Sequence, residues 1–253
     1  MGSTGRATSG SVSSDSDDLL ERIDYDESRK YKIFRGVEAT GGWREGMEYT
    51  GSGEDTERWF HDHSNAEELE SEMSDAEITA WHRWSNGTYM DGELYRPYSQ
   101  LSDTAKRDIK VYDKYLDRAT LHESARVVRR SDAQMLLGKG ERSATLEQIQ
   151  ALRGRVIKAN APMSSGAAST GLRIGSSKAS KPVEYRYHIA GGTTGAGMYI
   201  GRQSETLTGW GRRQREFVIN RDTYWAIGSS WYDEKKDAIV VNMYYTGRGR
   251  HKY

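Results

Sequence analysis

Hydrophobic residues in the first half of the chain recur at the spacing of an α-helix. Ser74 and Glu77 form a Ser-x-x-Glu capping box, in which each side chain satisfies a free backbone N–H of the first helical turn. Ile78, Trp81 and Trp84 follow at near-helical spacing, and an Asn-Gly pair comes directly after them. The pattern predicts a helix that begins at the capping box and ends at the Asn-Gly pair.

Two neighbouring segments are also expected to be helical. Residues 102–118 open with a Ser-Asp pair, which is favourable at a helix N-terminus, and we expect a helix there. Its buried stripe is expected to consist of Ile109, Tyr112, Tyr115 and Leu116. Residues 54–77 hold ten acidic residues and a single Arg, which predicts a solvated, helical approach to the rest of the chain.

After residue 121 the chain consists of short runs of apolar and polar residues separated by glycine-rich joins. Alternation with a period of two is typical of β-strands, because successive side chains point to opposite faces. The expected strands cover residues 125–128, 155–157, 183–189, 198–200, 215–219, 224–227 and 238–245, with a brief helix at 146–152. Helices followed by many strands indicate an α+β fold, with N-terminal helices and two packed, mostly antiparallel β-sheets.

The distribution of apolar residues divides the chain into three parts. Residues 1–18 are mostly Gly, Ser, Thr and Asp and have almost nothing to bury, so we expect a disordered tail. Residues 19–73 form an acidic N-terminal segment or arm, a candidate contact for a carrier protein or a virion partner. Residues 74–253 are expected to form the folded domain.

The composition excludes several classes of protein. The 253 residues include no cysteine, which rules out a disulfide scaffold, a thiolate nucleophile and Cys-ligated metal sites. Apolar runs are only a few residues long, so we expect no membrane-spanning segment. The first twenty residues lack the apolar core of a secretory signal. We therefore expect a soluble, cytoplasmic protein, or one that is delivered into a host cell.

The formal net charge of zero conceals two oppositely charged halves. Residues 121–253 carry 22 Lys and Arg against 11 Asp and Glu, a net charge of +11, which leaves −11 for residues 1–120. One interpretation is that the two halves attract each other within one fold. The other is that the basic half meets an anionic ligand, such as a dinucleotide pyrophosphate or a nucleic acid. Charge alone does not choose between them.

Two local patterns are not expected to carry chemistry. His61 and His63 flank an Asp on the acidic segment, where a His pair of this spacing is usually solvated, and we expect no metal site. Gly195-Ala-Gly197 lacks the Lys and hydroxyl of a phosphate loop and the glycine spacing of a dinucleotide fingerprint. Its glycines are expected to let neighbouring backbones approach closely.

Four features of the strand-rich half occur in a specific order. Arg129 ends a predicted strand, and a serine pair, Ser164 and Ser165, follows a strand and turn. A glycine-rich strand comes next, at residues 192–200, and then a loop that leads to Gln214-Arg-Glu216 and three apolar residues. Gln214 and Glu216 are two positions apart, so they share one face of an extended chain.

This order resembles the mono-ADP-ribosyltransferase superfamily, in the Arg–Ser-Thr-Ser–Gln/Glu-x-Glu branch of the clostridial exoenzymes and binary toxins, with similar domains in phage-carried transferases. The resemblance covers roughly residues 75–246 and implies two packed sheets around an NAD cleft. The chain departs from the family pattern at Arg130, where relatives commonly have Gly. It also departs at residues 163–166, which read Met-Ser-Ser-Gly. These departures make the choice between Arg129 and Arg130 and the register of the serines uncertain.

The resemblance implies a role for each motif residue. Glu216 is the catalytic carboxylate, which binds a ribose hydroxyl and stabilises the cation that forms when NAD is cleaved. Gln214 assists catalysis and reads the acceptor, and Gln at this place argues against arginine as the acceptor. The implied NAD-binding residues are Arg129, Ser164, Ser165 and Glu216, and the implied target-recognition residues are Trp210, Arg213 and Gln214.

The expected function is therefore an NAD-dependent mono-ADP-ribosyltransferase, as in a toxin or phage effector. Its acceptor is expected to be a macromolecule, either a protein side chain other than arginine or a nucleic-acid base. Two alternatives remain open at this point: a non-catalytic module that binds nucleic acid or a partner through its basic half, and a virion-associated structural protein anchored by its N-terminal segment.

Overall fold

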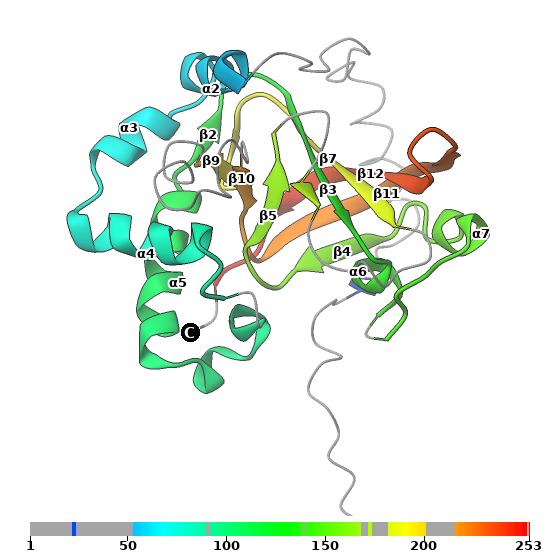
Figure 1. The fold of residues 1–253 in the computed structure, drawn as a ribbon, viewed down its shortest axis with the longest axis horizontal. Helices are drawn as coiled ribbons and strands as arrows, with labels where there is room; N and C mark the ends of the chain where they lie inside the picture. Colours follow the sequence, from blue (N-terminus) through cyan, green and yellow to red (C-terminus); the bar gives the residue numbers. More distant parts are fainter. Residues whose placement is uncertain are drawn as a thin grey trace, which may run out of the picture.

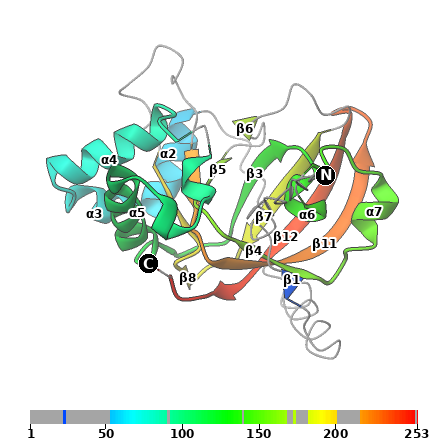
Figure 2. The ribbon, with the colours of Figure 1, turned by 90° about the horizontal axis from the view of Figure 1, so that it is seen from below.

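The computed structural model describes residues 53–89, 92–138, 140–167, 182–200, 216–251 and 253, together with two-residue strands at 22–23 and 172–173. Helices come first along the chain and group at one end of the molecule (Figures 1 and 2). The helices are α2 (Gly53–Asp62), α3 (Ala66–Ser71), α4 (Asp75–Ser85), η2 (Glu93–Tyr95), η3 (Tyr98–Gln100) and α5 (Asp103–Leu116). Two short helices, α6 (Gln134–Leu137) and α7 (Leu146–Gln150), lie among the strands.

The strands form one large sheet and a two-stranded one. In chain order they are β1 (Arg22–Ile23), β2 (Thr120–Leu121), β3 (Ala125–Ser131), β4 (Val156–Ala159), β5 (Met163–Gly166), β6 (Leu172–Arg173), β7 (Val183–Ile189), β8 (Thr193–Thr194), β9 (Gly197–Tyr199), β10 (Glu216–Ile219), β11 (Thr223–Asp233) and β12 (Ala238–Arg248). The large sheet has the order β1-β4-β11-β12-β7-β3-β5-β10-β9, with β6 beside β3, and β2 pairs with β8. Only β12–β7 and β3–β6 are parallel among the described pairs. The expected α+β class, with mostly antiparallel strands, is confirmed.

The large sheet consists of two parts that share a core. The link between β3 and β5 is a single residue pair, Val128 with Gly166. On one side of the link lie the long strands β3, β7, β12 and β11, and on the other lie β5, β10 and β9. Side chains from both parts, including Tyr187, Trp225 and Phe217, form one hydrophobic cluster. The two parts therefore pack against each other, as the prediction of two packed sheets required.

Two motif segments lie on strands that extend beyond the expected ones. The serine pair follows β4 and the connection at residues 160–162, as expected, but it lies inside β5, a strand that was not expected, whose four residues all pair with β10. The sequence Met-Ser-Ser-Gly has no alternation that would mark a strand, and its strand conformation is stabilised by pairing with β10 and, at Gly166, with β3. Arg129 does not end its strand, because β3 continues to Ser131 alongside β7. Both differences place the motif residues on a regular sheet instead of on turns.

The helical end forms a second hydrophobic cluster against β9 and β10. The capping box of α4 is present, with the Glu77 carboxylate accepting a hydrogen bond from the Ser74 backbone N–H at 2.9 Å. The predicted stripe of α5 is buried in full. Together with Met198 and Val218 from β9 and β10, these residues fill the space between helices and sheet. The two helices predicted from hydrophobic periodicity are thus confirmed.

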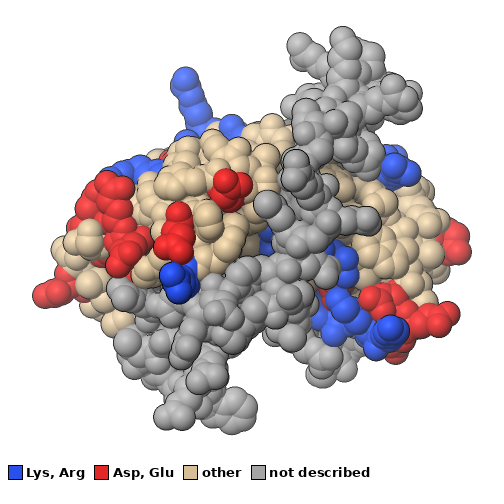
Figure 3. Space-filling view, turned by 90° about the horizontal axis from the view of Figure 1, so that it is seen from above, with Lys and Arg blue, Asp and Glu red and all other residues tan. Residues whose placement is uncertain are grey.

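The acidic segment before α4 is helical, as predicted, but it is not only a solvated approach. Phe60 of α2 is 3% exposed and stacks on Tyr199 with ring centroids 4.7 Å apart, and Leu69 of α3 is 1% exposed. On the face shown in Figure 3, acidic side chains gather over the helical end at the left. The division of the chain at residue 74 stays a prediction. In the part of the chain that the structure describes, no helix is long and apolar enough to cross a membrane.

The second glycine of the Gly-Ala-Gly pattern, Gly197, allows a close approach of backbones, as expected. Gly197 has a φ of 157°, and a Cβ atom there would lie 2.4 Å from the carbonyl oxygen of Val218 on β10. No side chain fits at such a distance. Gly197 therefore lets β9 pair with β10 along residues 217–219, which fixes the strand that begins at Glu216.

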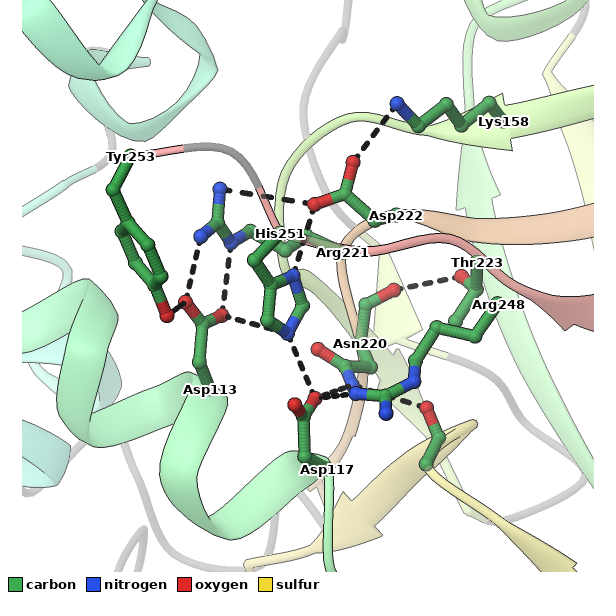
Figure 4. A network of polar contacts seen from close by, with 11 residues as sticks. Asp113, Asp117, Lys158, Asn220, Arg221, Asp222, Thr223, Arg248, His251 and Tyr253 are labelled. Atoms are coloured by element: carbon green, nitrogen blue, oxygen red, sulfur yellow. Dashed lines mark hydrogen bonds and ion pairs between the residues drawn. The ribbon is translucent and has the colours of Figure 1, made fainter.

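A network of buried charges ties α5 to the turn after β10 and to the C-terminal residues (Figure 4). The Arg221 guanidinium donates two hydrogen bonds to the Asp113 carboxylate, at 2.8 and 2.6 Å, and the Tyr253 hydroxyl donates to the same carboxylate at 2.8 Å. Arg248 forms an ion pair with Asp117. These contacts join the acidic first half of the chain to the basic second half, so part of the charge asymmetry serves attraction within the fold.

His251 stands at the centre of this network. Its Nδ1 lies 2.9 Å from Asp222 Oδ2, and its Nε2 lies 2.7 Å from Asp117 Oδ1. Burial alone would lower the pKa of His251, but the hydrogen bonds to these two carboxylates and the charge of Asp113 raise it to about 9. His251 is therefore a cation at neutral pH that holds the C-terminal segment against α5.

We expect the stability of the protein to fall between pH 6.5 and pH 9. The folded-state pKa of His251 lies above its ordinary value of 6.5, so its contribution is complete below pH 6.5 and is lost as the pH rises through about 9. The wild-type Tm should drop by several degrees over this range, since about 1 kcal/mol shifts Tm by roughly 2–4 °C in a chain of this size.

Calorimetry of two variants tests this linkage. His251→Gln should lower the Tm at pH 6.5 and flatten its decline, whereas His122→Gln, at an exposed position, should leave the decline unchanged. A His251→Gln variant whose Tm declines as steeply as that of the wild type would contradict the role assigned to His251.

Candidate active site

Strand alternation places Glu216 on the side of the sheet that faces the helices. Phe217 and Ile219 of β10 point into the core between the two parts of the sheet, and Val218 points into the core against the helices. Glu216 is two residues before Val218 and therefore shares its face. The Glu216 side chain is only 2% exposed. A carboxylate so deeply buried requires partners.

Glu216 is held through one carboxylate oxygen. The Ser164 hydroxyl on β5 donates a short hydrogen bond to Oε1, and the indole Nε1–H of Trp84 on α4 donates to the same Oε1 at 2.8 Å. Among the described residues, nothing donates a hydrogen bond to Oε2. The two donors come from different elements, a strand and a helix, and together they orient the carboxylate.

Arg129 of β3 contacts the backbone of Ser164. Its Nη1 donates a hydrogen bond to the backbone oxygen of Ser164 at 2.8 Å, and the residue is 8% exposed. The buried Nε of Arg129 has no hydrogen-bond partner in the part of the chain that the structure describes. A charged guanidinium with an N–H that no described residue accepts is suited to bind an anionic ligand, because its planar group presents several donors together.

The structure distinguishes Arg129 from its neighbour Arg130. Adjacent residues of a strand point to opposite faces, and Arg130 turns away from Ser164. Its Nη2 donates to the Lys236 backbone oxygen at 2.9 Å, and its Nε lies 3.5 Å from the buried carboxylate of Glu184. Arg129 alone of the two lies beside Ser164 and Glu216.

The pKa of Glu216 results from opposing effects. Burial raises the pKa of this carboxyl above its ordinary value. The hydrogen bonds from Ser164 and Trp84 and the positive charge of Arg129 lower it, but they only partly offset the burial. These three residues therefore favour the ionised form of the carboxyl against the effect of its burial.

Not every predicted site residue joins this cluster. Ser165 points to the other face of β5, where its fully buried hydroxyl donates to the Phe217 backbone oxygen at 2.7 Å. It thus links β5 to β10 and does not contact Glu216. Trp210, Arg213 and Gln214 lie outside the described residues, and their roles stay predictions.

The contact of Trp84 with Glu216 was not expected from the sequence. Helical spacing places Trp84 in the apolar stripe of α4, and the ring does pack edge-on against Tyr112, with centroids 5.5 Å apart. Its partner Glu216 is 132 positions away along the chain, a pairing that helical periodicity does not reveal. The available signal was chemical: a partly buried indole N–H needs an acceptor.

The arrangement combines a fixed anion with a nearby, partly unpaired cation. Oε2 of Glu216, to which no described residue donates, can accept a hydrogen bond from a hydroxyl or stabilise a positive charge that develops beside it. Arg129 can at the same time hold an anionic group of the same ligand. Among the described residues, no cluster of three or more His, Asp or Glu could bind a metal ion. The cluster suits a ligand that carries both a sugar hydroxyl and a phosphate.

Comparison with known proteins identifies the fold. No family model and no curated protein sequence matches the chain. Solved structures do match. The ADP-ribosyltransferase toxin Plx2a from Paenibacillus larvae superposes with a TM-score of 0.61 at 15% identity, over 79% of this chain and 99% of that one.

Two further structures are similar to the same extent. The C3 exoenzyme of Clostridium limosum gives a TM-score of 0.60 at 16% identity, over 79% of this chain and 96% of its own. C3stau2 from S. aureus, whose structure contains NAD, gives 0.59 at 17% identity, over 81% of this chain and all of its own. The chain therefore has the fold of the C3-like ADP-ribosyltransferases, and the fold implied by the motifs is confirmed.

We expect Glu216→Gln to raise the Tm at pH 7. Burial raises the pKa of Glu216, so the ionised side chain costs stability at every pH above its folded-state pKa, and a neutral amide of the same shape removes that cost. The gain should shrink as the pH falls towards the ordinary carboxyl value of 4.5, where the wild-type side chain is itself protonated.

Glu184 supplies the matched control for this measurement. It is also 2% exposed, but Lys236 Nζ lies 2.7 Å from its Oε1 and Arg186 Nε lies 3.0 Å from the same atom. Glu184→Gln should lower the Tm, because it removes the buried carboxylate that these partly buried cations pair with. Thermal scans in which Glu216→Gln is destabilised as much as Glu184→Gln would show that Glu216 is an ordinary structural carboxylate.

Proposed function

We propose that the chain is an NAD-dependent mono-ADP-ribosyltransferase with Glu216 as its catalytic carboxylate. The observation that carries the proposal is the buried Glu216, whose Oε1 accepts hydrogen bonds from Ser164 and Trp84 while no described residue donates to Oε2. The fold of C3-like ADP-ribosyltransferases supports the assignment, as does the order of Arg129, Ser164 and Glu216 along the chain. The presence of NAD in the C3stau2 structure supports NAD as the co-substrate.

The reaction breaks the bond between the nicotinamide nitrogen and C1′ of the ribose. The bonding electrons leave with nicotinamide, and the ribose becomes an oxocarbenium-like cation. An acceptor nucleophile then bonds to C1′ and loses its proton. Glu216 contributes a fixed negative charge beside the developing cation, and its Oε2 accepts a hydrogen bond from a ribose hydroxyl. Preorganised charge in a buried site contributes most to such a step, because little reorganisation is needed.

Arg129 would bind a phosphate of NAD. Its guanidinium is anchored by the hydrogen bond to the Ser164 backbone oxygen, which leaves other donors of the fork for a ligand. The same backbone oxygen belongs to the residue whose hydroxyl holds Glu216. Phosphate binding and carboxylate orientation therefore both depend on Ser164 of β5, which sets the distance between the Arg129 guanidinium and the Glu216 carboxylate.

The acceptor is assigned from the sequence alone. Gln214, Trp210 and Arg213 are proposed to recognise it, and Gln214 favours a protein side chain other than arginine or a nucleic-acid base. The relation to toxins supports action on a macromolecule of a host cell after delivery, as a toxin or phage effector. The N-terminal segment at residues 19–73 is the proposed contact for a carrier or virion partner.

A module that only binds nucleic acid has less support. The excess of basic residues in the second half is what suggested it, yet Arg221 and Arg248 use their charge on Asp113 and Asp117 inside the fold. Arg130, Arg186 and Lys236 likewise surround Glu184. Fewer cations are therefore left for a phosphate backbone than the net charge indicates.

Labelling with radioactive NAD tests the proposed activity. In a whole-cell lysate, the wild type should attach label to macromolecules, and Glu216→Gln should reduce the rate by at least about 100-fold while binding NAD with similar affinity. Glu184→Gln serves as the control for a lost buried carboxylate outside the site. Removal of the label by protease or by nuclease distinguishes a protein acceptor from a nucleic acid. Equal labelling by wild type and Glu216→Gln would overturn the proposal.

A pair of arginine variants tests the NAD contact. Arg129→Ala should weaken NAD binding roughly 10- to 100-fold, because a hydrogen bond to a charged group contributes about 1.5–3 kcal/mol. Arg130→Ala should bind NAD as the wild type does and lose thermal stability instead, since it leaves Glu184 with one cation fewer. Isothermal titration calorimetry measures the first effect and thermal unfolding the second. Weaker NAD binding by Arg130→Ala than by Arg129→Ala would reverse the assignment.

A further inference from the structure

We propose that Trp84 is a positioning residue for Glu216: its indole N–H holds Oε1 so that Oε2 is presented to the substrate. This inference rests on the proposed function, because it assigns Trp84 a part in the same site. The contact joins the last turn of α4 to the first residue of β10 at 2.8 Å. Among the described residues, Trp84 is the residue of the helical layer that donates a hydrogen bond to the Glu216 carboxylate.

The indole is held in a defined place by its surroundings. Its ring meets Tyr112 edge-on, and the Tyr112 hydroxyl donates to the Ala80 backbone oxygen of α4 at 2.8 Å. The adjacent Arg83 donates two hydrogen bonds, at 2.6 and 2.5 Å, to the buried Asp108 of α5. α4 is thereby fixed on α5 at the turn that carries Trp84. A donor fixed in this way costs little further entropy when it orients a carboxylate.

The chemistry of the indole differs from that of the serine hydroxyl on the same oxygen. A Trp Nε1–H only donates, whereas a Ser hydroxyl donates or accepts by rotation. Ser164 can therefore adapt to a protonated Glu216, but Trp84 always requires Oε1 as an acceptor. A donor to an ionised acceptor forms the stronger hydrogen bond, so Trp84 favours the carboxylate over the carboxylic acid and directs any proton to Oε2.

Among the described residues, three side chains favour the charged form of Glu216. Arg129 on β3 supplies the positive charge that acts on the carboxylate, and Ser164 on β5 and Trp84 on α4 supply neutral donors. Burial acts against all three by raising the pKa of Glu216. Loss of the indole N–H therefore leaves burial less opposed, and the carboxyl keeps its proton to a higher pH.

Trp81 offers a matched control on the same helix. It is fully buried and also packs on Tyr112, with ring centroids 4.8 Å apart. Its Nε1 has no hydrogen-bond partner in the part of the chain that the structure describes. Trp81→Phe and Trp84→Phe therefore remove the same atoms from the same helix, but only the second removes a donor from Glu216.

Kinetics of NAD hydrolysis over a range of pH values test the proposal. Trp84→Phe should lower kcat about 10- to 100-fold, the loss of one hydrogen bond to a charged group, and should move the acid limb of kcat to higher pH. The KM for NAD should change little, because Arg129 and the rest of the site remain. Trp81→Phe should keep the wild-type acid limb. An unmoved acid limb in Trp84→Phe, or equal shifts in both variants, would overturn the proposal.

An NMR titration of the protein without NAD separates this inference from the proposed function. The indole ¹H–¹⁵N resonance of Trp84, assigned by its loss in Trp84→Phe, should shift as Glu216 titrates, and Glu216→Gln should abolish that shift. The Trp81 resonance should not follow the same curve. If the Trp84 resonance titrates but no variant or wild type cleaves NAD, the function fails and the contact stands. If it does not titrate with Glu216, the positioning role is wrong whatever the activity.

Discussion

The candidate site is organised around one deeply buried carboxyl group, that of Glu216. Glu216 is 2% exposed, and burial of a charge is costly unless donors and opposite charges compensate. Three elements provide the compensation: α4 through Trp84, β5 through Ser164 and β3 through Arg129. Both hydrogen bonds end on Oε1, and no described residue donates to Oε2, the oxygen that we propose meets the ligand. A purely structural carboxylate such as Glu184 is instead surrounded by cations.

The rest of the fold serves to bring these elements together. The short strand β10 is flanked by β5 and β9, and Gly197 permits the close pairing with β9. The side chains of β10 alternate: Phe217 and Ile219 point into the core between the two parts of the sheet, and Val218 points into the core against the helices. The charge network around Asp113 and His251 secures the turn directly after β10. Stability of the helical layer and geometry of the site are therefore linked, since α4 both covers the sheet and supplies a donor to Glu216.

Local patterns in the sequence predicted the elements but not their pairing. Helices α4 and α5 followed from caps and periodicity, and most long strands followed from alternation, because both signals act over a few residues. β5 was missed because Met163, Ser164, Ser165 and Gly166 adopt a strand only through pairing with β10. The order of the motifs located Glu216, Ser164 and Arg129. Trp84 contacts a residue 132 positions away along the chain, and no local pattern reveals that contact. Ser165 points to the face of β5 opposite to that of Ser164, and this depends on how β5 is oriented in the sheet.

A crystal structure of the protein with NAD or a slowly cleaved NAD analogue tests the central claim most directly. The account predicts that Oε2 of Glu216 lies within hydrogen-bonding distance of a hydroxyl of the nicotinamide ribose while Oε1 keeps the hydrogen bonds from Trp84 and Ser164. It also predicts a phosphate of the dinucleotide on Arg129. A dinucleotide whose nicotinamide ribose lies away from Glu216, or a carboxylate that turns Oε1 to the ligand and releases Trp84, would contradict the account.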